Sequence, residues 1–368
     1  MYSLVALLLA IIHFGTPLAY YAYITKRYSS RSWNVRIEVN YQPNVTIIIP
    51  TYNEAKTIWK KLNNIYEQDY PKDKIELIVI DSGSTDGTPL LIRKWAEGHK
   101  DLTLKLIQEP IRMGKAQALN KALKYTTGEI VIITDADSIW LSKDTVSRVV
   151  RMFSNPMIGA ISCIKEPIMT NRGVELSYRR YYNLLRVAES KIWSTPIFHG
   201  ELAAFRRDVL EKLGGFPTDI GADDSHMAHM ITMSGYRAIV LDHVKAGELV
   251  PKGLSSYMKW RIRRAQHLIQ HFIRAIRDVK HAPNGYKTVL LIESYLHLIN
   301  PWMLPLVLLL LVLGTLTSET SAITLMLIGT LPLAYRPYRT WILSQAILIV
   351  AMIKNIWSKE LVWEKQIK

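Results

Sequence analysis

Cysteine is almost absent from this chain of 368 residues, which contains only Cys163. A single cysteine excludes an internal disulfide and suits a reducing compartment. Acidic residues are also scarce, with 31 Asp and Glu against 46 Lys and Arg, so the net charge is +15. A balance of this sign favours a negatively charged partner, either nucleic acid or a membrane surface.

Long hydrophobic runs are missing from the middle of the chain, which reads like a soluble protein. They lie at its two ends, in residues 3–24, 295–316, 321–335 and 341–357. The first two runs are long enough to cross a hydrocarbon core of ~30 Å, and the last two are borderline at 15 and 17 residues. We predict four transmembrane segments.

The first hydrophobic run has the flanks of a membrane anchor. No basic residue precedes it and no small-x-small cleavage site follows it, as a secretory signal would require. Lys26, Arg27, Arg31 and Arg36 come directly after it. The positive-inside rule then places the amino terminus outside and the middle domain in the cytoplasm, and the chain is predicted to be an integral membrane protein.

The excess positive charge gathers beside the hydrophobic runs. Residues 252–280 contain eight Lys or Arg and one acid, Asp278, with apolar residues at roughly helical spacing. This pattern favours a basic amphipathic helix on a lipid bilayer over nucleic acid, and the alternative is a solvated basic face. The predicted organisation is a transmembrane helix at 1–27, an α/β domain at 44–250, basic interfacial helices at 251–285, and about three transmembrane helices at 290–358.

The region 44–250 alternates short β-branched runs with amphipathic stretches. Strands are expected at 45–49, 75–80, 104–107 and 130–134, with a helical stretch at 115–125. This alternation predicts a largely parallel sheet covered by helices. In such sheets ligands bind beyond the carboxyl ends of the strands, and four of these ends are unusually polar.

The first two polar ends are "PTYNEAKTI" (50–58) and "DSGSTDGT" (81–88). Pro50 closes the first strand, Glu54 opens the following helix, and Asp81 stands at the end of the second strand. Each segment alone could be a turn with a helix cap. Together they place Glu54 and Asp81 at neighbouring strand ends, where carboxylates can accept hydrogen bonds from a base or from ribose hydroxyls.

The third and fourth polar ends carry a lysine and two aspartates. Gly114 and Lys115 begin a helix, and this arrangement offers backbone N–H groups and an ammonium to a pyrophosphate, although a lysine at a helix start is also common on surfaces. Asp135 and Asp137 in "TDADS" follow a buried strand, and alternation along that strand would make them converge. Two adjacent carboxylates repel each other, and a hard divalent ion shared with substrate phosphates relieves this repulsion. An Asp-x-Asp pair by itself is a weak motif.

In order and spacing, "IIIPTYNE", "VIDSGSTDGT", "GKAQALN" and "TDADS" resemble the donor-binding half of family 2 glycosyltransferases, over about residues 45–270. The resemblance implies an α/β GT-A (Rossmann-like) catalytic domain with a mostly parallel mixed sheet, plus transmembrane helices. It implies that Glu54, Asp81 and Asp135 hold the nucleoside, Lys115 the diphosphate, and Asp137 an Mg or Mn ion beside Asp135. Pro50, Tyr52 and Gly114 belong to the same donor-binding motifs.

The acceptor half resembles the family in "FHGELAAFRRDVL" (198–210) and "GADDSHM" (221–227). The first segment places Gly200 and Glu201 on the acceptor side, and the second does so for Asp223. The last carboxylate, Asp224, is predicted to be the general base, because a sugar hydroxyl is a poor nucleophile until its proton is taken. Alternatively, Asp223 and Asp224 serve only as a helix cap and a first-turn acid.

Membrane-bound synthases of this family carry a Gln-x-x-Arg-Trp motif, and "KWRIRRAQ" (259–266) departs from it. Trp260 takes the place of the glutamine and Arg264 that of the tryptophan, while Arg263 matches. An arginine prefers phosphate where an indole would stack on a sugar chain, so Arg261, Arg263 and Arg264 are predicted to face the diphosphate. This departure argues against processive polymerisation.

The sequence as a whole predicts an inverting, metal-dependent glycosyltransferase. Its donor would be a nucleoside-diphosphate sugar, with uridine favoured by analogy to the synthases, and its acceptor a hydroxyl of a lipid-linked or growing saccharide. A polyprenyl phosphate acceptor is the alternative, since an anionic nucleophile needs no base. A nucleotidyltransferase and a non-catalytic membrane scaffold remain as readings from other classes.

Overall fold

A computed structural model of the chain describes residues 1–168, 173–251 and 253–362. Its centre is an eight-stranded sheet with the strand order β3-β2-β1-β4-β7-β6-β8-β5. Strands β1 to β4 run parallel to one another, and β7 is antiparallel to both β4 and β6. The predicted mixed, mostly parallel α/β sheet is confirmed, and its four predicted strands are the first four of the structure.

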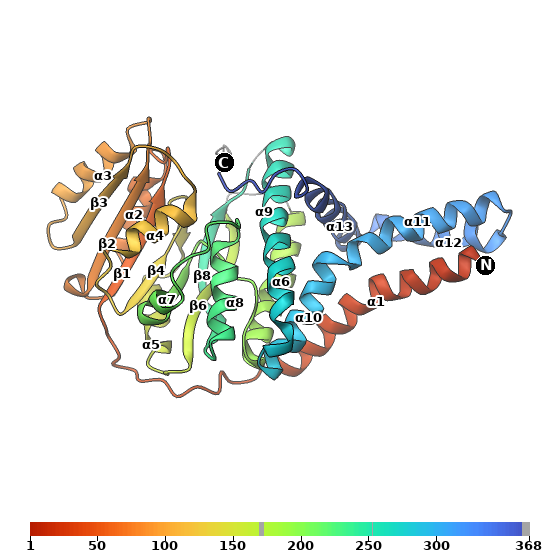
Figure 1. Cartoon of the computed structure of the whole chain (residues 1–368), viewed down its shortest axis with the longest axis horizontal. Helices are drawn as coiled ribbons and strands as arrows, with labels where there is room; N and C mark the ends of the chain where they lie inside the picture. Colours follow the sequence, from red (N-terminus) through yellow and green to blue (C-terminus); the bar gives the residue numbers. More distant parts are fainter. Residues whose placement is uncertain (169–172, 252, 363–368) are drawn as a thin grey trace.

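The strands and helices of the described residues alternate through most of the chain (Figure 1). The strands are β1 Val45–Thr51, β2 Ile75–Ser82, β3 Thr103–Glu109, β4 Ile130–Ile133, β5 Ser138–Trp140, β6 Ile158–Ile168, β7 Ala203–Arg206 and β8 Arg237–Leu249. The helices around the sheet are α2 Ile58–Tyr66, α3 Thr88–Glu97, α4 Lys115–Leu123, α5 Thr145–Met152, α7 Arg207–Lys212 and α8 Asp223–Met233. The remaining helices are α1 Tyr2–Tyr28, α6 Gly173–Ile192, α9 Leu254–Ala275, α10 Asn284–Leu298, α11 Asn300–Leu316, α12 Thr320–Thr330 and α13 Arg336–Lys354.

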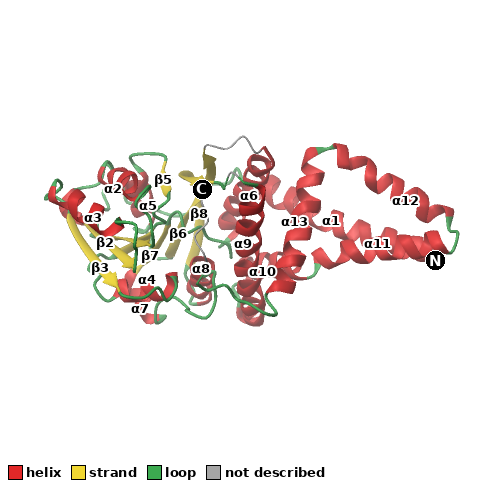
Figure 2. Cartoon of the chain, turned by 90° about the horizontal axis from the view of Figure 1, so that it is seen from above, coloured by secondary structure: helices red, strands yellow, loops and turns green. Residues whose placement is uncertain are grey.

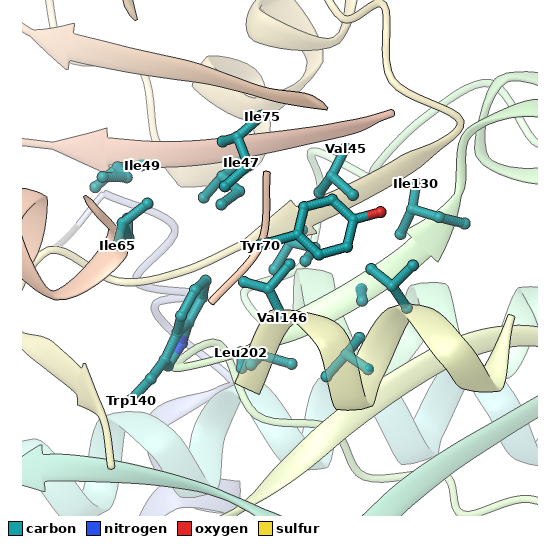
Figure 3. Close-up of a cluster of buried hydrophobic side chains, with 14 of the residues drawn as sticks. Val45, Ile47, Ile49, Ile65, Tyr70, Ile75, Ile130, Trp140, Val146 and Leu202 are labelled. Carbon is teal, nitrogen blue, oxygen red and sulfur yellow. The ribbon is translucent and has the colours of Figure 1, made fainter. Parts of the chain in front are cut away.

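Both faces of the sheet are covered, which is why β1 carries apolar residues on both of its sides. Val45, Ile47 and Ile49 point to one face, where they pack with apolar residues of α2, α3 and α5 (Figure 3). Ile48 points to the other face, toward α4, α7 and α8. All four side chains have no exposed surface. Burial of each such side chain contributes about 1.5–3 kcal/mol, so the strand ends that hold the polar loops are fixed by a rigid core.

The helical part of the molecule projects from the sheet domain as an elongated arm (Figures 1 and 2). Helices α1, α11, α12 and α13 correspond to the four predicted transmembrane segments. Within the described residues, α1 alone is long and apolar enough to cross a membrane as a single helix. Helices α10 and α11, which meet at a bend of 42°, are long and apolar enough to cross a membrane if they form one span. Helix α12 is apolar but shorter.

Helix α9 joins the sheet domain to the arm. It contacts α13 and α10 on one side and α8 on the other. Its buried residues include Arg261, Gln266, His267 and Gln270, which are polar. The predicted basic amphipathic helix is therefore present from 254 to 275, packed against protein over much of its circumference, and position 252 of the predicted interfacial segment lies outside the described residues.

Candidate active site

A cavity of about 350 Å³ lies where the carboxyl ends of β1 and β4 meet α4, α8 and α9. Its wall contains almost every site residue predicted from the sequence. These are Pro50, Tyr52, Glu54, Gly114, Lys115, Asp135, Asp137, Gly200, Glu201, Asp223, Asp224, Trp260, Arg261, Arg263 and Arg264. Segments more than two hundred residues apart in the sequence thus share one cavity.

Asp81 is the predicted site residue that is not among those lining this cavity. Its side chain accepts hydrogen bonds from Thr51 Oγ1 at 3.0 Å and from the Ser84 backbone N–H at 3.0 Å. It is 1% exposed. In this structure, Asp81 ties the ends of β1 and β2 together, while its neighbour Ser82 reaches the cavity.

The first loop is shaped by hydrogen bonds to the second. Asn53 adopts a positive φ of 54°, and its backbone N–H donates to Ser84 Oγ at 2.7 Å. The Glu54 carboxylate accepts from Thr57 Oγ1 at 2.6 Å, which turns it back onto the start of α2. Arg112 lies over the Tyr52 ring, with its guanidinium carbon 4.2 Å from the ring centroid. This flat pair provides a stacking surface at the edge of the cavity.

Lys115 sits at the centre of the cavity. Gly114 precedes it with φ 110°, a conformation that favours glycine, and so starts α4 with its N-terminus toward the cavity. Lys115 Nζ donates to Asp135 Oδ1 at 2.8 Å and lies 3.9 Å from Asp223 Oδ2. Burial would lower the pKa of this ammonium, but the charges of Asp135, Asp223 and Asp224 outweigh burial and raise it. Lys115 therefore stays protonated at neutral pH.

Gly200 makes this arrangement possible. A Cβ atom at this position would lie 2.7 Å from Lys115 Nζ and 3.1 Å from Asp135 Oδ2. The backbone N–H of Asp135 donates to the Gly200 carbonyl at 3.1 Å. Because Gly200 has no side chain, the loop around it can pack directly against Lys115 and Asp135.

Asp135 and Asp137 do not lie on the strand. β4 ends at Ile133, and both aspartates belong to the turn that leads into β5. The expectation that alternation along the strand makes the two aspartates converge is therefore wrong. The strand was predicted to reach residue 134, but it ends at Ile133, before either aspartate. They nevertheless line the same cavity, since the turn between the two strands brings them there.

The oxygen ligands on offer suit a hard divalent ion. Asp135 and Asp137 supply carboxylates, and the described residues contain no group of three or more His, Cys, Asp or Glu arranged to hold a metal alone. Mg²⁺ and Mn²⁺ are commonly held by one or two carboxylates, with substrate phosphates completing the coordination. The two aspartates fit this pattern.

Asp223 and Asp224 occupy the first turn of α8, opposite Lys115. Asp224 Oδ1 accepts from the Ser225 backbone N–H at 2.7 Å. Burial, together with the adjacent charge of Asp223, raises the pKa of Asp224 to about 7. Burial likewise raises the pKa of Asp223. A carboxylate with a pKa near neutrality at a cavity wall is suited to take a proton from a hydroxyl.

The part of the cavity wall around Glu201 contains a buried ion-pair network. Of its members, only Glu201, Arg261 and Arg264 were predicted from the sequence. Lys165 Nζ is 2.7 Å from Glu201 Oε1 and 3.7 Å from Glu248 Oε2. Arg179 is 3.0 Å from Glu248 and 2.8 Å from Glu175. Lys165 and Glu248 lie on neighbouring strands, β6 and β8, which are eighty residues apart. No local pattern marks them, because only the strand order brings them together.

Two arginines of α9 complete the network. Arg264 bonds to Glu248 and lies 3.9 Å from Glu201, and Arg261 lies 3.6 Å from Glu175. Arg264 also stacks on Trp260, with its guanidinium carbon 4.7 Å from the ring centroid. The two residues that depart from the synthase motif therefore contact each other, and Arg264 is engaged with carboxylates of the cavity wall.

Arg263 has different surroundings. Burial and the neighbouring Arg264 lower its pKa to about 10. The charges of Glu360, Asp135 and Asp137 act on this pKa in the opposite direction. Arg263 and the two aspartates line the same cavity and interact electrostatically.

This chain is similar to known proteins both in sequence and in fold. Residues 46–214 match the family model described as glycosyl transferase family 2. The chain is 52% identical to the mannosyltransferase PcManGT from Pyrobaculum calidifontis, whose structure was solved in complex with GDP-Man and Mn²⁺. The match covers 98% of this chain and 100% of that one, with a TM-score of 0.90.

Curated relatives match less of the sequence. An N-acetylglucosaminyltransferase of Azorhizobium caulinodans is 27% identical over 65% of this chain and 63% of its own length. A poly-beta-1,6-N-acetyl-D-glucosamine synthase of Staphylococcus epidermidis is 25% identical over 67% of this chain and 60% of its own. The match thus spans less than two thirds of these two relatives. The likeness to PcManGT is far closer, and the chain belongs to glycosyl transferase family 2 as a hexosyltransferase.

Proposed function

We propose that this protein transfers mannose from GDP-mannose, with inversion, to a hydroxyl of a lipid-linked or growing saccharide. The observation that supports this best is that one cavity joins Lys115 and the Asp135–Asp137 turn to Asp224. Sequence motifs favoured uridine only by analogy to the synthases. The 52% identity to PcManGT, which was solved with GDP-Man, moves our proposal to guanosine.

The donor half of the cavity would hold the nucleoside diphosphate. Tyr52 and Arg112 offer a surface for the base, and Glu54 accepts hydrogen bonds from hydroxyls. The Lys115 ammonium at the N-terminus of α4 neutralises phosphate charge, and the cationic Arg263 adds to it from α9. Asp137, together with Asp135, would hold a Mn²⁺ or Mg²⁺ ion, which neutralises charge on the departing diphosphate when bound.

The acceptor half would supply the base. Asp224 accepts the proton of the attacking hydroxyl as the new bond forms at the anomeric carbon. Its ionised form is available at neutral pH because its pKa is about 7. The alternative acceptor, a polyprenyl phosphate, would already be anionic before attack, so its reaction would not need Asp224 as a base.

The helical arm would hold the catalytic domain at the cytoplasmic face of a membrane. Exposed leucines and isoleucines on α1, α11 and α12 suit contact with lipid. Basic residues follow α1 on the side of the catalytic domain, as the positive-inside rule requires of a cytoplasmic side. A lipid-linked acceptor would then be presented in the bilayer beside the cavity.

The donor is tested by incubating the purified protein with GDP-mannose, UDP-glucose and UDP-N-acetylglucosamine, with released nucleoside diphosphate measured in water and with membrane-lipid extracts. We expect extract-dependent release of GDP from GDP-mannose. Release from a uridine donor alone would refute the guanosine assignment. Release of a sugar 1-phosphate instead would indicate transfer of the nucleotidyl group, as by a nucleotidyltransferase, and no turnover of any donor would favour a scaffold.

The residue roles are tested with two substitutions. Asp137→Ala should abolish Mn²⁺-dependent binding of GDP, and undiminished binding would refute the metal assignment. Asp224→Asn should retain GDP binding and lose transfer to a hydroxyl acceptor. Full transfer by this variant would show that Asp224 is not the base and would favour a polyprenyl phosphate. Asp208→Asn, the same change at an exposed position on α7, is the matched control.

A further inference from the structure

A buried lysine lies beneath the Asp135–Asp137 turn and belongs to none of the sequence motifs. Lys61 extends from α2, is 1% exposed, and donates from Nζ to Thr134 Oγ1 at 2.6 Å and to Ser138 Oγ at 3.2 Å. Within the described part of the chain Lys61 forms no ion pair with a carboxylate, and Nζ lies 4.7 Å from the centroid of the Trp140 ring. A buried ammonium without an ion-pair partner is costly, so the position calls for an explanation other than stability.

The two hydroxyls that Lys61 contacts bracket the aspartate turn. Thr134 Oγ1 donates to the Glu201 carbonyl at 2.7 Å, and Ser138 Oγ donates to the Asp135 carbonyl at 2.8 Å. Each hydroxyl has one proton to give. Because Lys61 donates to both oxygens, each hydroxyl acts as a donor toward a backbone carbonyl. Ser138 Oγ also lies 3.4 Å from the Glu201 carbonyl, a longer contact than the one to Asp135. The lysine thereby fixes the direction of the hydrogen bonds at both ends of the turn.

Without the lysine, this order would be lost. The two hydroxyl oxygens are 3.3 Å apart and could bond to each other, so one proton would leave its carbonyl. The turn would then lose a bond either at Asp135 or at Glu201. Burial lowers the pKa of Lys61 to about 7. Both the ammonium and the neutral amine can donate two hydrogen bonds, so this function does not depend on its charge.

We propose that Lys61 is a positioning residue for the divalent-cation site, which holds Asp135 and Asp137 in place through Thr134 and Ser138. This inference rests on the proposed metal-dependent function. It differs from a purely electrostatic role. A positive charge behind the turn would repel an incoming cation, and its removal would then strengthen metal binding. Positioning predicts the opposite, because a loosened pair of carboxylates binds the ion less well.

The test measures Mn²⁺ binding in the presence of GDP, from the loss of the electron paramagnetic resonance signal of free Mn²⁺. For Lys61→Met we expect roughly tenfold weaker Mn²⁺ binding, the equivalent of one lost hydrogen bond to a charged group. Lys60→Met, the same change at the exposed neighbour on α2, should leave binding unchanged. Ile65→Val, a small core change on the same helix, should lower the melting temperature without affecting Mn²⁺.

Ser138→Ala provides a second route if Lys61→Met does not fold. We expect it to weaken Mn²⁺ binding as well, and the double variant to be no weaker than Lys61→Met alone, because both act through one hydrogen-bond chain. Unchanged or tighter Mn²⁺ binding in folded Lys61→Met, or unchanged binding in Ser138→Ala, would overturn this role. Absence of GDP-dependent Mn²⁺ binding in the wild type would refute the proposed metal-dependent function itself, and the inference with it.

Discussion

Acidification should switch off transfer by protonating Asp224. Its pKa of about 7 means that about half of the molecules carry the ionised base at pH 7. The ionised fraction is then roughly a tenth at pH 6 and a hundredth at pH 5. If Asp224 is the base, kcat/KM for a hydroxyl acceptor falls about tenfold per pH unit below 7. The rate falls with acidification, and does not rise, because only the ionised carboxylate can take a proton from the acceptor.

The assay is initial-rate GDP release from GDP-mannose between pH 5 and 9, with a saccharide acceptor and saturating Mn²⁺. Asp224→Asn should give a low and flat profile in this range. GDP binding, measured separately by calorimetry, should change far less than the rate, because Lys115 stays protonated throughout. A wild-type rate that is constant from pH 5 to 7 would refute the assignment of the base.

Protonation of Asp224 should also affect the stability of the fold, in the direction opposite to its effect on the rate. The folded state raises the pKa of Asp224 from the ordinary value of 3.8, so protonated Asp224 favours the fold. That contribution is fully present below the unfolded pKa and is lost as pH rises through about 7. Asp224→Asn should therefore melt at a higher temperature than wild type at pH 8 and at a similar temperature at pH 4. Equal melting temperatures at both pH values would contradict the burial of this charge.

Three further changes probe the walls of the cavity. Lys115→Met should weaken GDP binding by at least tenfold in calorimetry, because it removes the ammonium nearest the proposed diphosphate, and equal affinity would move the phosphates elsewhere. Lys165→Met should lower the free energy of unfolding, measured by chemical denaturation, by about 3–5 kcal/mol, because it leaves Glu201 and Glu248 buried without their shared cation. A decrease below about 1 kcal/mol would show that water solvates these carboxylates. Gly221→Ala should lower the melting temperature, since its Cβ would lie 2.2 Å from the His267 ring.

Much of the donor half could be predicted from the sequence. Its motifs are local, because each strand end carries its own polar loop, and the parallel order of β1, β2 and β4 brings the ends together. The strand predicted at 75–80 corresponds to β2, Ile75–Ser82, because its run of apolar, mostly β-branched residues is buried in the sheet. The error over Asp135 and Asp137 arose at a boundary, because the strand stops at Ile133 and the turn begins before the first carboxylate.

The acceptor half was less accessible to sequence reasoning. Lys165, Glu175, Arg179 and Glu248 read as ordinary charged residues of strands and a helix, and nothing in their spacing indicates burial. Their burial depends on β6 and β8 pairing side by side and on α6 packing over both strands, with Arg261 and Arg264 reaching them from α9. Lys61 was missed for the same reason, since a lysine on an amphipathic helix is normally assigned to its solvated face.

The charged wall of the cavity has a consequence for how the protein can change over evolution. Each carboxylate in it serves more than one cation, as when Glu248 contacts Lys165, Arg179 and Arg264. A single neutral substitution would strand a buried charge, so drift at these positions must proceed through paired changes. The loops after β1 and β2 are joined by hydrogen bonds between uncharged groups, such as the one from the Asn53 backbone N–H to Ser84 Oγ, and a change at such a bond leaves no buried charge behind. In homologues, the preference for a donor should therefore diversify faster than this wall does.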